Sequence, residues 1–159
     1  MKAETWMAAV SALALTLGSA AALDTRAATS QNLSTPGTSC AAYNAGQALD
    51  IDYLSYGVRN ANAAVRPVIC PIVRHPVTGP AQSYYIDGSN LNGACTSCTV
   101  YAYNYTGQLL SSSSFNQCGA TYDQPVSLPT VNYWSFVSVV CYLPASYNGV
   151  LFGAFAVDN

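Results

Sequence analysis

Charged side chains are scarce in this sequence of 159 residues, of which only 8% are charged. Beyond residue 22 there is no lysine and no glutamate, and the ionisable side chains there include four arginines, six aspartates and one histidine. Nucleic acids and anionic lipid surfaces are bound through clustered lysine and arginine. The composition therefore excludes nucleic acid and an anionic membrane surface as partners.

Residues that favour helices are equally short in supply, because long charged side chains are among the best helix formers. In their place the chain has twelve tyrosines and many valines and threonines, which favour strands. Serine and asparagine, which favour turns, are also abundant. This balance predicts an all-β domain.

Long apolar runs are absent after the first 22 residues. Those residues place Lys2 before a short apolar run that ends in small residues at Ala22. The layout is typical of a secretory signal peptide, and the run is too short to span a bilayer. We expect residues 1–22 to be removed on export to the extracellular space or periplasm, with no membrane span left. The polar residues 23–39 are expected to form a flexible lead, and residues 40–159 a single domain.

Runs of strand-forming residues alternate with turn signals along that domain. They predict eight strands: 51–58, 65–73, 82–87, 98–105, 108–115, 121–128, 133–143 and 149–157. Eight short strands at this spacing predict an antiparallel β-sandwich, most simply a jelly roll, with an immunoglobulin-like sandwich as the alternative. In a jelly roll, strands 2, 7, 4 and 5 share one sheet, and strands 1, 8, 3 and 6 share the other.

Four short motifs resemble a layout shared by a group of small exported bacterial proteins with no assigned activity. They are Tyr56-Gly-Val-Arg-Asn60, Val68-Ile-Cys-Pro-Ile-Val-Arg74, Cys98-Thr-Val-Tyr101 and Val139-Val-Cys-Tyr-Leu-Pro144. The shared pattern is VxCPVVR…CTLY…LxCxLP, and the likeness runs from Cys40 to the C-terminus. It implies a bacterial, secreted β-domain and carries no catalytic residue across.

Six cysteines in an exported chain predict three disulfides, for which fifteen connectivities exist. The resemblance implies that Cys95 and Cys118 pair with each other, because both lie outside the shared pattern. We expect the other bridges to be Cys40–Cys70 and Cys98–Cys141, the second joining matched ends of neighbouring strands. The main competing arrangement is Cys70–Cys141 with Cys40–Cys98.

Motifs that could support catalysis are weak. Cys95 and Cys98 form a CxxC, but the residues after it read as a strand, without the helix that a redox site needs. His75 could belong to a hydrolase triad, yet no Gly-x-Ser-x-Gly elbow exposes a nucleophile. We assign no catalytic residue.

Three aspartates suggest a cation site. Asp50 and Asp52 lie where the first predicted strand begins, and Asp158 lies where the last one ends. As neighbours in a jelly roll, these strands would bring the three carboxylates to one sheet end, where they could bind Ca²⁺. The simpler interpretation is three solvated aspartates at strand ends.

Aromatic residues alternate with small apolar residues in two predicted strands. If the Cys98 and Cys141 faces point to the core, the aromatic residues face outward. An exposed apolar surface of this kind marks an interaction site, although the opposite phase would bury the rings. The candidate ligand-binding residues are Tyr101, Tyr103, Tyr105, Trp134, Phe136 and Tyr142.

These features predict a secreted, non-catalytic binding module that presents an aromatic face to a glycan or cell-surface ligand. The main alternative is an assembly subunit whose face packs on another copy, and the third is a small secreted hydrolase. Glycan binding by a monomer would indicate the first, concentration-dependent multimers the second, and turnover lost on His75→Ala the third.

Overall fold

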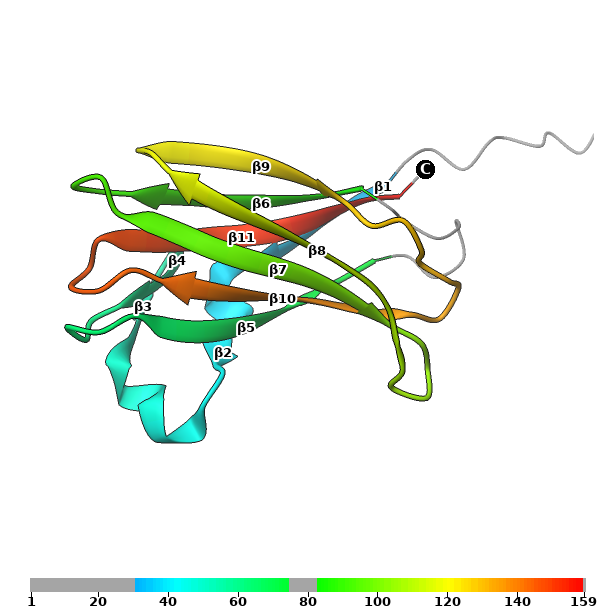
Figure 1. Ribbon diagram of the computed structural model, residues 1–159, viewed down its shortest axis with the longest axis horizontal. Helices are drawn as coiled ribbons and strands as arrows, with labels where there is room; N and C mark the ends of the chain where they lie inside the picture. The colour runs from blue at the N-terminus through cyan, green and yellow to red at the C-terminus, as the bar shows by residue number, and fades with distance from the viewer. Residues whose placement is uncertain (1–30, 75–82, 159) are drawn as a thin grey trace, which may run out of the picture.

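The computed structural model describes residues 31–74 and 83–158, which form two antiparallel sheets packed face to face (Figure 1). The six-stranded sheet contains β1 (Gln31–Pro36), β3 (Ile51–Leu54), β4 (Gly57–Asn60), β6 (Ser83–Asn90), β9 (Thr121–Ser127) and β11 (Gly149–Asp158). The five-stranded sheet contains β2 (Ala41–Ala42), β5 (Arg66–Ile72), β7 (Cys95–Tyr103), β8 (Leu109–Cys118) and β10 (Phe136–Leu143). Two short 3₁₀ helices, η1 (Gly37–Ser39) and η2 (Ala45–Asp50), lie among the first strands.

The strand order confirms the predicted jelly roll. One sheet has the order β3-β4-β11-β6-β9, and the other has the order β2-β5-β10-β7-β8. The central run β5-β10-β7-β8 corresponds to predicted strands 2, 7, 4 and 5. Its counterpart β4-β11-β6-β9 corresponds to predicted strands 1, 8, 3 and 6.

The predicted first strand, 51–58, is instead a hairpin. The chain turns after Leu54, so β3 pairs with β4, and only β4 reaches β11. Gly57 permits this turn to pack closely, because a Cβ at that position would lie 2.3 Å from the carbonyl oxygen of Leu151.

The predicted flexible lead, 23–39, is wrong for its second half. Residues 31–36 form β1, which pairs with β11 from Gln31↔Asp158 to Pro36↔Gly153. The pairing forms because β4 covers only Val150 and Leu151 and leaves the rest of that edge of β11 open. Backbone hydrogen bonding, which needs no apolar side chains, therefore orders a polar segment.

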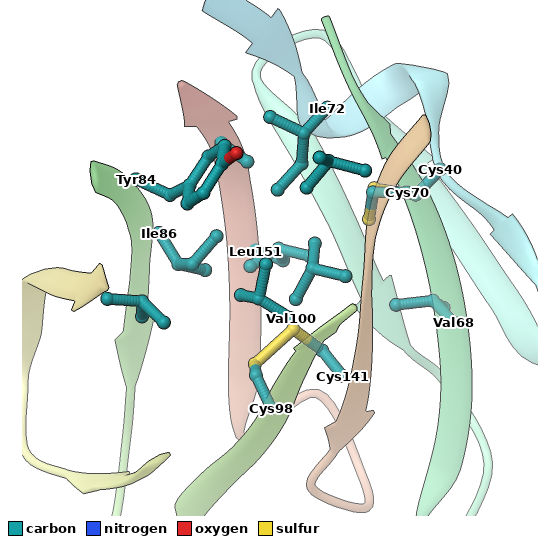
Figure 2. Packing of buried hydrophobic residues seen from close by; sticks show 14 of the residues in the cluster. Cys40, Val68, Cys70, Ile72, Tyr84, Ile86, Cys98, Val100, Cys141 and Leu151 are labelled. Atoms are coloured by element: carbon teal, nitrogen blue, oxygen red, sulfur yellow. A yellow bond between two sulfur atoms is a disulfide. The ribbon is translucent and has the colours of Figure 1, made fainter. Parts of the chain in front are cut away.

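The core lies between the inward faces of the sheets. Val68 and Val100 of one sheet belong to the same buried cluster as Ile86 and Leu151 of the other, and Figure 2 labels all four. Val68 lies on β5 and Val100 on β7. All four side chains are fully buried. Burial of aliphatic side chains at roughly 25 cal/mol per Å² is what holds such sheets together.

All three predicted disulfides are present: Cys40–Cys70, Cys95–Cys118 and Cys98–Cys141. Their Cα atoms are 4.1, 4.2 and 4.1 Å apart. Cys98 and Cys141 are direct partners in the β7–β10 register, and both are buried in the core (Figure 2). This bridge fixes which face of each strand points inward.

Candidate functional site

The outer face of the five-stranded sheet carries the aromatic residues that the alternation predicted. In β7, Cys98, Val100 and Ala102 are buried, whereas Tyr101 and Tyr103 between them are half-buried on the other side. The two tyrosine rings stack at a centroid distance of 6.1 Å. The predicted phase of β7 is therefore confirmed.

The neighbouring strand β10 has the same phase. Val137, Val139 and Cys141 point to the core, while Phe136 and Tyr142 point outward and are 64% and 51% exposed. Because Phe136 pairs with Tyr103 in the sheet register, the outward aromatic residues of the two strands form one continuous surface.

Two loops add a ring each to the same end of this surface. Tyr105 follows β7 and is 78% exposed, and Trp134 precedes β10 and is 66% exposed. Both loops lie at the right-hand end of the molecule in Figure 1. The six candidate residues thus share one outer face, and the opposite phase, which would have buried them, is excluded.

Hydrogen bonds from the side chains of Ser135 and Arg74 stabilise the loop that presents Trp134. The Ser135 hydroxyl donates to the Asn132 carbonyl and accepts from the Asn132 backbone N–H, at 2.7 and 2.9 Å. Arg74, two residues after β5, is 9% exposed and donates to the carbonyl oxygens of Ser135 and Asn132. Trp134 itself has φ +61°, a left-handed conformation that favours glycine. A strained, exposed aromatic residue on a braced turn is a feature of binding sites.

A large groove of about 830 Å³ lies on this face over the paired strands β5 and β10. Outward residues of β5 and β10 line it together with the two loop rings and part of β2. These lining residues are mostly apolar and include Ala41, Ile69, Pro71, Val73, Tyr105, Trp134 and Phe136. We call this the large groove.

A small hollow of about 260 Å³ adjoins the large groove. Ile69 and Ser138 line both. The other residues around the small hollow are Tyr43, Tyr101, Tyr103, Val140 and Tyr142. In the described parts of the chain, the hydroxyls of these four tyrosines and of Ser138 have no hydrogen-bond partner. They are therefore available to a polar ligand.

Several of these residues were missed by the sequence reasoning. Ile69 and Pro71 of β5 form part of the groove, and Tyr43 is placed beside β5 by a 3.0 Å hydrogen bond from its N–H to the Pro67 carbonyl. The alternation in β5, where Val68 and Cys70 are buried, could have identified the first two. No sequence pattern points to Tyr43.

The predicted cation site is wrong, because the structure separates its aspartates. The β3–β4 hairpin reverses the chain, so Asp52 lies beside Arg59, which pairs with Val150 near the start of β11. Asp158 lies eight residues further along, at roughly 3.3 Å per residue. Within the described residues, no three His, Cys, Asp or Glu side chains are grouped to hold a metal.

The two remaining aspartates of that set form ion pairs. Asp52 lies 2.7 Å from Arg59, and Asp50 lies 2.6 Å from Arg66. Hydrogen bonds from Arg66 and Asn62 lower the pKa of Asp50 below its ordinary value. These carboxylates are thus surface charges with arginine partners. His75, the possible hydrolase residue, lies outside the described residues.

A second pair of carboxyl groups lies on the outer face of the other sheet. Asp87 of β6 is the register partner of Asp123 of β9. The pKa of Asp87 is raised to about 6, mainly by burial and secondly by the hydrogen bond with Asp123. This pair lies on the opposite sheet from the aromatic face and takes no part in it.

No protein-family model matches this chain, and no curated protein matches it. Among solved structures it is similar to a Podospora anserina GH26-CBM35 β-(1,4)-mannanase, with 10% identity and a TM-score of 0.45. That match covers 80% of this chain but only 28% of the mannanase chain. It is also similar to TmCBM61 in complex with β-1,4-galactotriose, with 7% identity, a TM-score of 0.44, and 83% and 90% of the two chains covered.

No helix within residues 31–74 and 83–158 has the length and apolar character needed to cross a membrane.

Proposed function

We propose that this protein is an exported, non-catalytic binding module that holds a glycan on the outer face of its five-stranded sheet. The observation that carries the proposal is the outward phase of β7 and β10, which places four aromatic residues around two adjoining hollows, with Tyr105 and Trp134 added from the loops. Export accords with the three disulfides, since such bridges persist in oxidising compartments. The signal-like residues 1–22 and the bacterial resemblance belong to the same proposal.

A glycan suits this face because a sugar ring has both an apolar side and a rim of hydroxyls. The rings of Trp134 and Tyr103 offer flat apolar surfaces, and the tyrosine hydroxyls around the small hollow can donate or accept hydrogen bonds. Sites with mostly apolar walls and a few well-placed polar groups are the usual form of small-ligand sites.

The first test is a glycan array probed with the monomeric protein, followed by titration of any glycan that binds. Tyr103→Ala should weaken that binding by about 2 kcal/mol, because a ring at the centre of such a surface carries much of the affinity. Tyr53→Ala is the matched control, since Tyr53 is an exposed tyrosine on β3 of the other sheet. Equal effects of the two variants would contradict the proposed site.

The same face could instead pack against a second copy, and the large apolar groove is the observation that favours this alternative. Sedimentation of the purified protein separates the two functions. Multimers that increase with concentration and disappear in Phe136→Ala would favour assembly. A monomer that binds glycan would favour the binding module.

A further inference from the structure

The two adjoining hollows differ sharply in chemistry. Tyrosine and serine hydroxyls surround the small hollow, whereas hydrocarbon lines most of the large groove. Of the polar side chains at the large groove, Arg74 and Ser135 are buried and already bonded to the turn that carries Trp134. The other polar groups of its lining are the hydroxyls of Ser39, Ser138 and Tyr105 and the indole N–H of Trp134, so most of the wall offers a sugar no hydrogen-bond partner.

The hollows are adjacent, because Ile69 and Ser138 contribute to both. A single ligand can therefore extend from one into the other. The volume of the large groove, about 830 Å³, falls within the range of roughly 300–1,000 Å³ typical of small-ligand sites.

The face also selects against charge. The described residues that line the two hollows include no carboxylate and no lysine. Arg74, their one ionic group, donates to two backbone carbonyls. A cationic ligand would lose its hydration here without gaining an opposite charge, and an anionic ligand would meet only the buried guanidinium of Arg74.

Building on the proposed glycan-binding function, we infer that the ligand is an uncharged, amphipathic glycoside. Its sugar lies in the small hollow and an attached alkyl or acyl chain lies in the large groove. Ser138 and Ile69 mark the point where the two parts of the ligand join. This inference adds the apolar substituent, which plain glycan binding does not require.

The test compares methyl and octyl β-glycosides of glucose, galactose and mannose, each kept below its critical micelle concentration and titrated by calorimetry. For at least one sugar, the octyl glycoside should bind at least about a hundredfold more tightly than the methyl glycoside. Burial of a methylene contributes about fourfold in Kd, so four buried methylenes suffice. 1-Octanol alone should bind more weakly than the octyl glycoside.

Two variants separate the parts of the site. Phe136→Ala, in the large groove, should lower the octyl-to-methyl affinity ratio at least threefold. Tyr142→Phe removes one hydroxyl from the small hollow, so it should weaken both glycosides by a similar factor and leave the ratio unchanged. Melting curves equal to that of the wild type show that both variants are folded.

An octyl-to-methyl ratio below about threefold, or a ratio that Phe136→Ala leaves unchanged, would overturn the inference. If methyl glycosides or array glycans bind in that case, the proposed function still stands. If octyl glycosides bind no more tightly than 1-octanol, the sugar contributes nothing, and both the inference and the proposed function are wrong.

Discussion

At the scale of the residue, Trp134 combines exposure with backbone strain. Its φ of +61° costs a non-glycine residue roughly 1–2 kcal/mol. We predict that Trp134→Gly leaves the free energy of unfolding unchanged or higher, because glycine adopts this conformation without penalty. Binding of the glycan should nevertheless fall. Urea unfolding and calorimetry on the same samples check both halves, and a marked loss of stability would show that the indole supports the fold.

Arg74 is expected to act as a positioning residue for the same turn. Arg74→Met would remove the donors to the carbonyls of Asn132 and Ser135. Leaving buried polar groups unpaired costs about 1–3 kcal/mol each, so we predict a lower free energy of unfolding together with weaker binding. Near-ultraviolet circular dichroism should also show a less ordered Trp134. An unaltered spectrum would contradict the bracing role.

The raised pKa of Asp87 predicts that the stability of the folded protein depends on pH. This pKa of about 6 in the folded protein lies above the ordinary value of 3.8. The folded state therefore holds a proton that the unfolded state has lost, and stability falls as the pH rises from about 4 to 6. Asp87→Asn should remove this contribution and raise the melting temperature at pH 7 relative to the wild type. The difference between the two proteins should vanish near pH 4, and a constant difference from pH 4 to 7 would contradict the assignment.

Sequence reasoning at this scale succeeded where one constraint fixed a whole strand. The Cys98–Cys141 bridge sets the phase of β7 and β10, and alternation then places each aromatic side chain. It failed for Asp50 and Asp52, because the turn after Leu54 reverses the chain, so that β4, and not the segment that holds Asp52, pairs with β11.

At the scale of the element, two of the disulfides differ in their exposure to solvent. Cys98–Cys141 lies in the core, whereas Cys95–Cys118 ties the exposed ends of β7 and β8. The chain-entropy contributions are similar, at about 3–4 kcal/mol each, because the sequence separations are 43 and 23.

We therefore predict that replacing Cys98 and Cys141 by alanine costs more stability than replacing Cys95 and Cys118, owing to the cavity left in the core. Mild reduction of the native protein should open Cys95–Cys118 first. Chemical denaturation and mass spectrometry of alkylated cysteines are the measurements. Prior opening of the buried bridge would contradict the packing described above.

Elements with a clear alternating pattern were predictable, and β1 was not. Its residues, Gln31–Pro36, are polar and small, and only the open edge of β11 makes them a strand. That edge is a property of the assembled sheet, which no local window of sequence contains. The outward residues of β5 that line the large groove were missed for a related reason, since they form a groove only when β10 lies beside them.

At the scale of the whole molecule, the jelly roll gives the two sheets different outer surfaces. The five-stranded sheet presents the aromatic face, and the six-stranded sheet carries the Asp87–Asp123 pair. The described residues that line the two hollows offer a ligand no exposed charged group with which to form an ion pair. Glycan affinity should therefore change less than about twofold between 50 and 500 mM salt. A steep loss of affinity with salt would indicate that a charged ligand is bound elsewhere.

The most direct test of the central claim compares binding and stability in Trp134→Ala. The sequence contains two tryptophans, Trp6 and Trp134, so a protein that begins at Leu23 reports on this site alone by fluorescence. We expect the variant to lose about 2 kcal/mol of glycan affinity, with a free energy of unfolding within about 0.5 kcal/mol of the wild type. A destabilisation of about 3–5 kcal/mol, or unchanged binding of the glycan, would contradict the claim that this face is the binding site.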